Sequence, residues 1–339
     1  MSITRRTAMH DTSLRAVVTA RRALHYALGG DVDEDRPAHV RAASSLAWIG
    51  GQIALVQDDA NFVALVDAAD GDAHVIALPR GKGGLRLFDD VRGNKKFKLD
   101  LEACAAIESV DGPVLLAFGS GSKKRRRTVV TIDRFDHDTP RVRTADATTF
   151  YELLETATAF AGGDMNIEGV LPIADTVRFF GRGNGATRRG IDAVNATCDV
   201  SLTALLEYLD DPIHRAPPGA DGFVQYALGN IDGVSLGFTD AASCGADVLY
   251  TATAEASADA TVDGAIAGSA VGVIDVTGGV RFAVITDANG VAIREKVEGL
   301  LLSRSAPGVV YLVLDPDDTT RPSELCTVAL HGDWSASFS

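Results

Sequence analysis

The chain has 339 residues, 46% of them hydrophobic and 23% charged, and a mean hydropathy of +0.09, a composition typical of a water-soluble globular protein. No apolar run approaches the roughly 18 to 20 residues that a membrane span needs, so a membrane partner is not expected. A net charge of −14 and a pI near 4.9 repel phosphate backbones over most of the surface, so nucleic acid is not expected as a partner either.

The start of the chain and its cysteines favour the cytoplasm. Arg5-Arg6 could belong to a twin-arginine export signal, but residues 7–13 contain no apolar segment. The four cysteines are far apart and lack the spacing of metal ligands, which predicts buried thiols: Cys104, Cys198, Cys244 and Cys326. We therefore expect a cytoplasmic protein with one domain that spans residues 1–339.

In chain order, residues 14–20 predict a single strand, and a polar loop follows at 29–35. From residue 43 onward, short apolar runs separated by Gly, Asp and Asn predict meanders of strands. Residues 148–161 have helical apolar spacing, and residues 201–209 fit either a short helix or an outer strand. The meanders form five groups, at residues 43–78, 100–143, 166–209, 231–285 and 297–330.

The last group lacks a fourth strand, because only residues 332–339 remain after its third. The strand at 14–20 would fill that position and join the two ends of the chain, so that no sheet edge is left open there. The sequence thus predicts an all-β fold. It is a single closed β-propeller of five blades, or of six if the N-terminal region contains another.

A short phrase of apolar, acidic and small residues recurs in the chain. The acids of its copies are 66, 64 and 66 residues apart, which indicates a repeat: Glu102, Glu168, Asp232 and Glu298. In the first group Ser45 takes the corresponding place. Because the first strand of each blade lines a propeller's channel, these acids should meet the ends of the second strands at its mouth. Those ends are Asp58-Asp59, Ser120–Ser122, Arg182–Asn184, Glu255 and Asp315.

The recurring acids are candidate metal ligands. Carboxylates that converge on one axis repel one another unless something neutralises them, and oxygen ligands suit calcium. Glu102, Glu168, Asp232 and Glu298 are therefore the candidate calcium ligands. The alternative is structural: each acid accepts hydrogen bonds from the neighbouring blade, and recurrence in every repeat favours this interpretation.

Two glycine-rich loops are candidates for binding a small anion. They follow equivalent strands at residues 119–127 and 181–189 and carry most of the local positive charge. Backbone amides in such loops can surround an anion, and arginine binds phosphate or carboxylate through two hydrogen bonds. The candidate residues are Ser120, Ser122, Arg182 and Asn184. The alternative is that both loops are simply solvated connections.

The phrase Val297-Glu298-Gly299-Leu300, followed by the strand that ends at Asp315, resembles bacterial β-propellers grouped as "esterase-like activity of phytase". The resemblance covers roughly residues 44–330 and implies acids that hold calcium and basic residues that hold phosphate. The chain departs from that group in having no signal peptide and no dense Asp cluster in each blade.

The sequence leaves the activity open. The first hypothesis is a propeller that binds a small anion or a cation at the channel mouth. The second is a hydrolase of phosphate or carboxylic esters, in which a bound metal would activate water. The third is a non-catalytic platform for a protein partner. The segment Gly233–Gly237 matches G-x-S-x-G, but it lies in a predicted strand and not at the strand-to-helix turn that a hydrolase serine needs.

Overall fold

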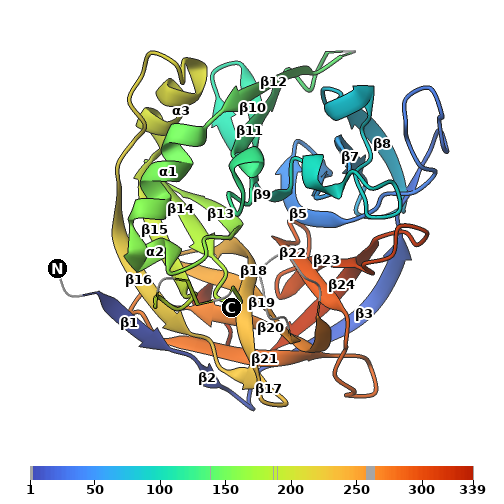
Figure 1. Ribbon diagram of the computed structural model, residues 1–339. Coiled ribbons are helices and arrows are strands. Elements are labelled where there is room, and N and C mark those ends of the chain that lie inside the picture. Colours follow the sequence, from blue (N-terminus) through green and yellow to red (C-terminus); the bar gives the residue numbers. More distant parts are fainter. Residues whose placement is uncertain (1–2, 138, 186, 189, 257–263, 339) are drawn as a thin grey trace.

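The computed structural model describes residues 3–137, 139–185, 187–188, 190–256 and 264–338. Its strands form curled sheets around a central space (Figure 1). Apart from short edge segments, the strands group into five antiparallel units of four strands, here called units 1 to 5. The fold is all-β, as the sequence predicted.

The five units follow one another along the chain, and unit 5 takes its fourth strand from the N-terminal segment. Unit 1 contains β5 (Ala43–Ile49), β6 (Gln52–Gln57), β7 (Phe62–Val66) and β8 (Asp72–Ala77). Unit 2 contains β9 (Leu101–Ser109), β10 (Gly112–Gly119), β11 (Thr128–Asp133) and β12 (Arg141–Asp146). Unit 3 contains β13 (Ile167–Ile173), β14 (Thr176–Gly181), β15 (Asn195–Ser201) and β16 (Ala220–Ala227). Unit 4 contains β18 (Val234–Cys244), β19 (Asp247–Ala256), β20 (Ala265–Ile274) and β21 (Val280–Thr286), preceded by β17 (Asn230–Ile231). Unit 5 contains β22 (Lys296–Leu302), β23 (Val309–Asp315), β24 (Glu324–His331) and β3 (Arg15–Ala23).

The N-terminal segment runs along the outside of four units. Strand β1 (Thr4–Thr7) pairs in parallel with β16 of unit 3, and β2 (Met9–His10) pairs in parallel with β21 of unit 4. Strand β3 pairs antiparallel with β24, the place expected for residues 14–20, and its other edge pairs with β21. Strand β4 (His25–Tyr26) pairs in parallel with β8 of unit 1. The segment therefore joins the two ends of the chain, supplies the outer strand of unit 5 and covers the outer edges of units 1, 3 and 4.

The helices lie where the sequence predicted helical spacing. Helices α1 (Thr148–Thr156) and α2 (Thr158–Ala161) occupy the predicted 148–161 segment, and α1 buries Phe150, Tyr151 and Leu154 in the core. Residues 202–210 form helix α3 (Leu202–Asp210), capped by the side chain of Ser201. The outer strand of unit 3 is therefore β16, so this unit extends past the predicted end at residue 209. Short 3-10 helices occur at Lys82–Gly84, Lys95–Phe97, Lys124–Arg126 and Ala336–Phe338.

The first full strands of the five units contact one another in cyclic order: β5, β9, β13, β18, β22 and again β5. Each of these inner strands contains one residue that has no partner on the second strand of its unit, which is a β-bulge. The five bulge residues are Ser44, Glu102, Glu168, Thr239 and Glu298. The recurring acids at 102, 168 and 298 are thus the bulge residues of their strands.

The bulges explain why a small residue follows the acid. A side chain on Gly299 would lie 3.2 Å from the Cα of Ser45 in the neighbouring inner strand. A side chain on Gly169 would lie 3.4 Å from the backbone of Asp240 and Ala241. The small residue therefore allows adjacent inner strands to approach closely, while the bulge changes the direction of the acidic side chain that precedes it.

Candidate functional site

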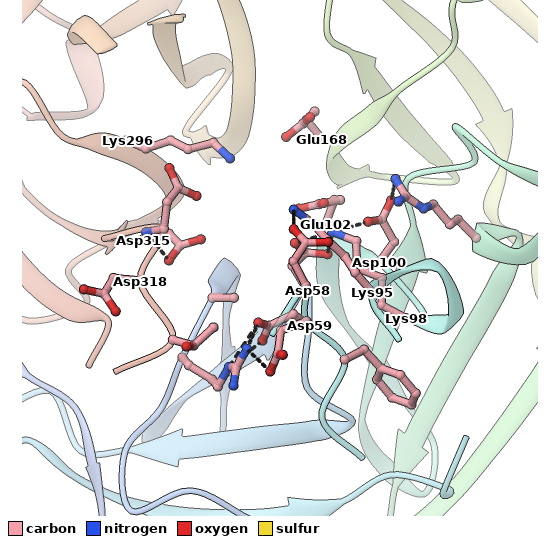
Figure 2. A pocket seen from close by; sticks show the side chains of 18 of the residues that line it. Asp58, Asp59, Lys95, Lys98, Asp100, Glu102, Glu168, Lys296, Asp315 and Asp318 are labelled. Atoms are coloured by element: carbon pink, nitrogen blue, oxygen red, sulfur yellow. Dashed lines mark hydrogen bonds and ion pairs between the residues drawn. The ribbon is translucent and has the colours of Figure 1, made fainter. Parts of the chain in front are cut away.

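A polar cavity of about 480 Å³ lies between the inner strands, and all five units contribute to its wall (Figure 2). Among the described residues, eleven carboxylates and six cationic side chains line it. The carboxylates are Asp58, Asp59, Asp89, Asp90, Asp100, Glu102, Glu168, Glu255, Asp315, Asp317 and Asp318. The cations are Arg41, Lys95, Lys98, Arg126, Arg182 and Lys296. The wall therefore has a formal charge of −5, which favours a positively charged ligand over an anion.

Three carboxylates from units 1 and 2 form one cluster at this wall. Oxygens of Asp58, Asp100 and Glu102 lie within 4.8 Å of one another. Lys98 Nζ lies 2.6 Å from an oxygen of Asp58 and 2.6 Å from one of Asp100. Arg126 Nη1 adds a second contact to Asp100 at 2.9 Å. Glu102 has no hydrogen bond or ion pair within the part of the chain that the structure describes.

The three acids of the cluster differ in acidity. Burial raises the pKa of Asp58 to about 7, and it raises the pKa of Glu102 well above its usual range. Burial also opposes ionisation of Asp100, but Lys98 and Arg126 outweigh it and hold the pKa of Asp100 well below its usual range. The cluster thus pairs an Asp100 whose ionised form is stabilised by Lys98 and Arg126 with a Glu102 whose ionisation is opposed by burial and by the neighbouring carboxylates.

On the other side of the cavity, acids of units 3, 4 and 5 surround two cations. Arg182, only 4% exposed, lies 2.6 Å from Glu255 and 3.5 Å from Glu168. Lys296 Nζ lies 2.6 Å from Glu298 Oε1. Burial raises the pKa of Glu168 to about 8, and the charge of Glu298 adds to the increase while Arg182 opposes it. On this side Arg182 and Lys296 pair with Glu255, Glu168 and Glu298, so each of the two cations already has an acidic partner.

The structure brings together part of each predicted site. Glu102, Glu168, Arg182 and Asn184 line the cavity. Glu298 is buried against Lys296 and does not contribute to the lining. The second-strand ends at Asp58-Asp59, Glu255 and Asp315 lie at the same cavity, where the alternation of strands placed them.

Ser120 and Ser122 do not form the predicted anion site. The hydroxyl of Ser120, fully buried, donates to a carboxylate oxygen of Asp100 and lies 2.8 Å from Ser122 Oγ. Arg126 donates to Ser122 at 2.9 Å. Both serines lie outside the cavity lining. Ser120 holds Asp100 in place and Ser122 contacts Ser120, because the glycine loop closes on the acid that directly precedes β9.

Asp232 is not part of the ring of acids, contrary to the sequence prediction. Asp232 and Gly233 form the two-residue turn between β17 and β18, with positive φ angles of 51° and 82°. Its carboxylate is exposed and lies 3.1 Å from Arg294. The bulge residue of unit 4 is Thr239, and that of unit 1 is Ser44 rather than Ser45. An Asp-Gly pair between two short strands is a strong hairpin signal that should have decided the position of Asp232.

The cationic residues Lys98 and Lys296 were missed by sequence reasoning. Lys296 precedes Glu298 by two residues in β22, so both side chains lie on the same face of that strand. Lys98 precedes Asp100 by two residues in the connection before β9, where Asp100 has a positive φ of 59°. The spacing of Lys296 and Glu298 is a signal that the sequence contained, because a lysine two positions from an acid in a strand can neutralise it.

A second set of buried contacts ties four units together one residue beyond the bulges. Asp240 Oδ2 accepts hydrogen bonds from Leu300 N at 3.0 Å in unit 5 and from Ser45 Oγ at 3.1 Å in unit 1. Ser45 Oγ in turn accepts from Cys104 N at 3.1 Å in unit 2. Asp240 is 1% exposed. An acid at the axis thus has the structural role that the sequence offered as an alternative.

Replacing Asp240 with alanine should lower the free energy of unfolding by about 2 to 3 kcal/mol, because it leaves buried donors in two neighbouring strands unpaired. Asp240→Asn retains one acceptor oxygen and should cost less. Urea unfolding of both variants measures the difference. A loss below about 1 kcal/mol for D240A would mean that these contacts do not hold the units together.

The sequence profile of one protein family, described as "Family of unknown function (DUF6929)", matches residues 39–330. The chain belongs to the DUF6929 family. This family differs from the "esterase-like activity of phytase" group that the repeated motif resembles. No curated protein matches the DUF6929 chain significantly.

Solved structures similar to this DUF6929 protein include several enzymes and one calcium-binding protein. The glutaminyl cyclase of Myxococcus xanthus is 12% identical, with coverage of 98% of this chain and 99% of that chain and a TM-score of 0.46. The PQQ-bound aldose sugar dehydrogenase of Streptomyces coelicolor is 9% identical over 95% and 100%, with a TM-score of 0.44. Regucalcin of Agrobacterium tumefaciens, a calcium-binding protein, is 12% identical over 91% and 97%, with a TM-score of 0.39.

Two further findings concern the cysteines and the helices of the DUF6929 protein. All four cysteines are buried free thiols, as the sequence predicted. Among the described residues, none of the helices is both long and apolar enough to cross a membrane.

Proposed function

We propose that the five units are the blades of a closed five-bladed propeller whose axial cavity binds a hard divalent cation, calcium being the best candidate. The ligands are Asp58, Asp100 and Glu102. The observation that carries the proposal is the cluster itself: three carboxylates within 4.8 Å of one another, one of which has no cationic partner among the described residues. Carboxylate oxygens in this number suit calcium, which completes its shell with water and backbone oxygens.

The charge balance supports a cation over the small anion that the sequence also suggested. Eleven carboxylates face six cations around the cavity, and Arg182 and Lys296 already have acidic partners. An anion would therefore have to compete with buried carboxylates for each cation. A divalent cation instead replaces the proton of Glu102 and relieves the repulsion among the three acids.

Lys98 is the internal competitor for the cation, because its ammonium group lies between Asp58 and Asp100. The proposal therefore predicts changes of opposite sign for two substitutions in one cluster. Asp100→Asn should weaken calcium binding by about tenfold or more, because it removes a charged ligand. Lys98→Met should strengthen calcium binding, because it removes the competing charge.

Isothermal titration calorimetry with CaCl2, in protein freed of metal by a chelator, measures both effects. Glu207→Gln, on the exposed surface of α3, is the matched control for loss of one negative charge and should leave the affinity unchanged. Calcium should also raise the melting temperature of K98M more than that of the wild type. Equal affinities for D100N and K98M would contradict the assignment.

Metal-dependent hydrolysis of a phosphate or carboxylic ester is the second candidate. The cavity volume of about 480 Å³ supports it, because this space holds a small molecule as well as an ion. No serine, cysteine or histidine is among the described residues that line the cavity. A bound metal would then supply the activated water. Hydrolysis of p-nitrophenyl phosphate or acetate that requires calcium and is lost in D100N would establish this activity.

A further inference from the structure

The outer edges of the five units differ in whether another strand pairs with them. Segments of the N-terminal chain pair with the outer strands of units 1, 3 and 4, and the outer strand of unit 5, β3, pairs with β21. Unit 2 is different. Its outer strand β12 pairs with β11 and, among the described residues, with no other strand. Figure 1 shows β12 at the outside of its sheet, far from the N-terminal strands.

The ladder shows which backbone groups of β12 face outward. Ala147 N donates to Arg127 O at 2.9 Å, so residues 141, 143 and 145 also face β11 in the regular antiparallel register. The N–H and C=O groups of Val142 and Thr144 therefore point away from the sheet. They form no backbone hydrogen bond in the described part of the chain. This edge is a template for one more strand.

The charged residues of β12 do not block this edge. Arg141 and Arg143 turn back toward the sheet, where they lie 2.7 Å and 3.3 Å from Asp133 of β11. Arg143 also reaches Asp210 of α3 at 3.1 Å. The side chain of Thr144 is exposed and has no hydrogen-bond partner among the described residues.

A groove of about 900 Å³ lies beside β12, between unit 2 and helix α3. Four consecutive residues of β12, 143–146, line it. Ile107, Val114 and Thr131 of β9, β10 and β11 line it as well, so the groove crosses one face of the unit 2 sheet and reaches β12, where alternate side chains of an added strand would lie on the same face. Its apolar lining comes from Ile107, Val114, Leu206, Leu209 and Ile213. Ile213 is 86% exposed.

The charges at the groove favour a basic occupant. Asp146, Glu207 and Asp210 line it with Arg143 as the one described cation. The side chains of Glu207 and Asp210 are 61% and 72% exposed and lie 3.1 Å from Arg215 and Arg143, respectively, in solvent-exposed ion pairs. A lysine or arginine in the occupant would thus meet exposed carboxylates, whereas alternate apolar residues would fill the groove.

We propose that the open edge of β12 binds an extended segment of a partner protein as a further strand. The segment carries apolar residues at alternate positions and at least one lysine or arginine. The chain itself shows the mode of binding, since stretches of two to four residues of its own N-terminal segment cover the edges of β8, β16 and β21 in this way. The proposal is independent of the cation site.

Selection of random ten-residue peptides displayed on phage, against the full-length protein, tests this directly. Peptides of the stated pattern should be enriched and should protect the amides of Val142 and Thr144 from hydrogen exchange. Thr144→Pro removes one outward N–H and should weaken binding of a selected peptide by about tenfold or more. Thr144→Ala, the matched control, retains the N–H and should stay within about twofold of the wild type.

Thr144→Pro should fold, because the removed N–H has no partner on β11 and proline is tolerated on edge strands. Ile213→Ser provides a second variant at an exposed position of the groove, and it should weaken the same peptide through loss of apolar contact without any change to β12. Failure to enrich any peptide would overturn the proposal. Equal binding to T144P and T144A would overturn it as well.

Discussion

Arg182→Met is expected to lower the free energy of unfolding by about 3 kcal/mol, because it leaves buried carboxylates without their counter-charge. Arg182 is 4% exposed and lies 2.6 Å from Glu255. Its charge also offsets that of Glu298, which is 4% exposed. Urea unfolding at neutral pH measures the loss.

The matched control is Arg178→Met. Arg178 pairs with Asp199 at 2.7 Å in the same unit, but its side chain is 29% exposed, so its removal should cost about 1 kcal/mol or less. The double variant R182M/E255Q should recover part of the loss, since it removes one of the carboxylates that R182M leaves without a counter-charge. If R182M and R178M cost the same, the buried acids of the cavity do not depend on Arg182.

A second large effect concerns pH. Burial raises the pKa of Glu168 to about 8 from an ordinary value of 4.5. The folded protein thus retains this proton at pH values where the unfolded chain has lost it. The resulting stability is fully present below pH 4.5 and is lost as the pH rises through about 8. We expect the free energy of unfolding to fall by up to about 1.4 kcal/mol per pH unit between about pH 6 and pH 8.

Urea unfolding in chelator-containing buffer across this range measures the slope. Glu168→Gln should make it shallower, because a neutral amide has no proton to lose, while Asp58 and Glu102 retain their contribution. Glu207→Gln, at an exposed position of α3, should leave the slope as it is. A slope in E168Q as steep as in the wild type would assign the pH dependence to other groups.

The sequence was sufficient for the all-β class and the strand groups because the strand pattern is local. Apolar runs separated by Gly, Asp and Asn located the strand groups, and the missing fourth strand of the last group located the partner of residues 14–20. Sequence reasoning was less successful where a helix and a strand compete for the same stretch. Residues 201–209 became α3, and the outer strand moved to β16.

The candidate site was predicted only in part because spacing is a poor guide to register. The regular interval placed Asp232 between Glu168 and Glu298. The bulge of unit 4 instead lies at Thr239, inside β18, because an extra hairpin precedes that strand. A repeat that contains an insertion no longer keeps its period. The positions of the cations that face these acids could not be predicted from the sequence pattern either, since Lys98 and Arg126 come from connections whose path depends on tertiary packing.

The most direct test of the central claim is a crystal of the protein soaked with terbium, which binds calcium sites through the same oxygen ligands and scatters X-rays anomalously. An anomalous peak is expected between the carboxylates of Asp58, Asp100 and Glu102, at the oxygen distances typical of a hard cation, about 2.3 to 2.6 Å. Calcium added in excess should remove the peak. A cavity without an anomalous peak, or a peak only at exposed acids outside it, would contradict the account.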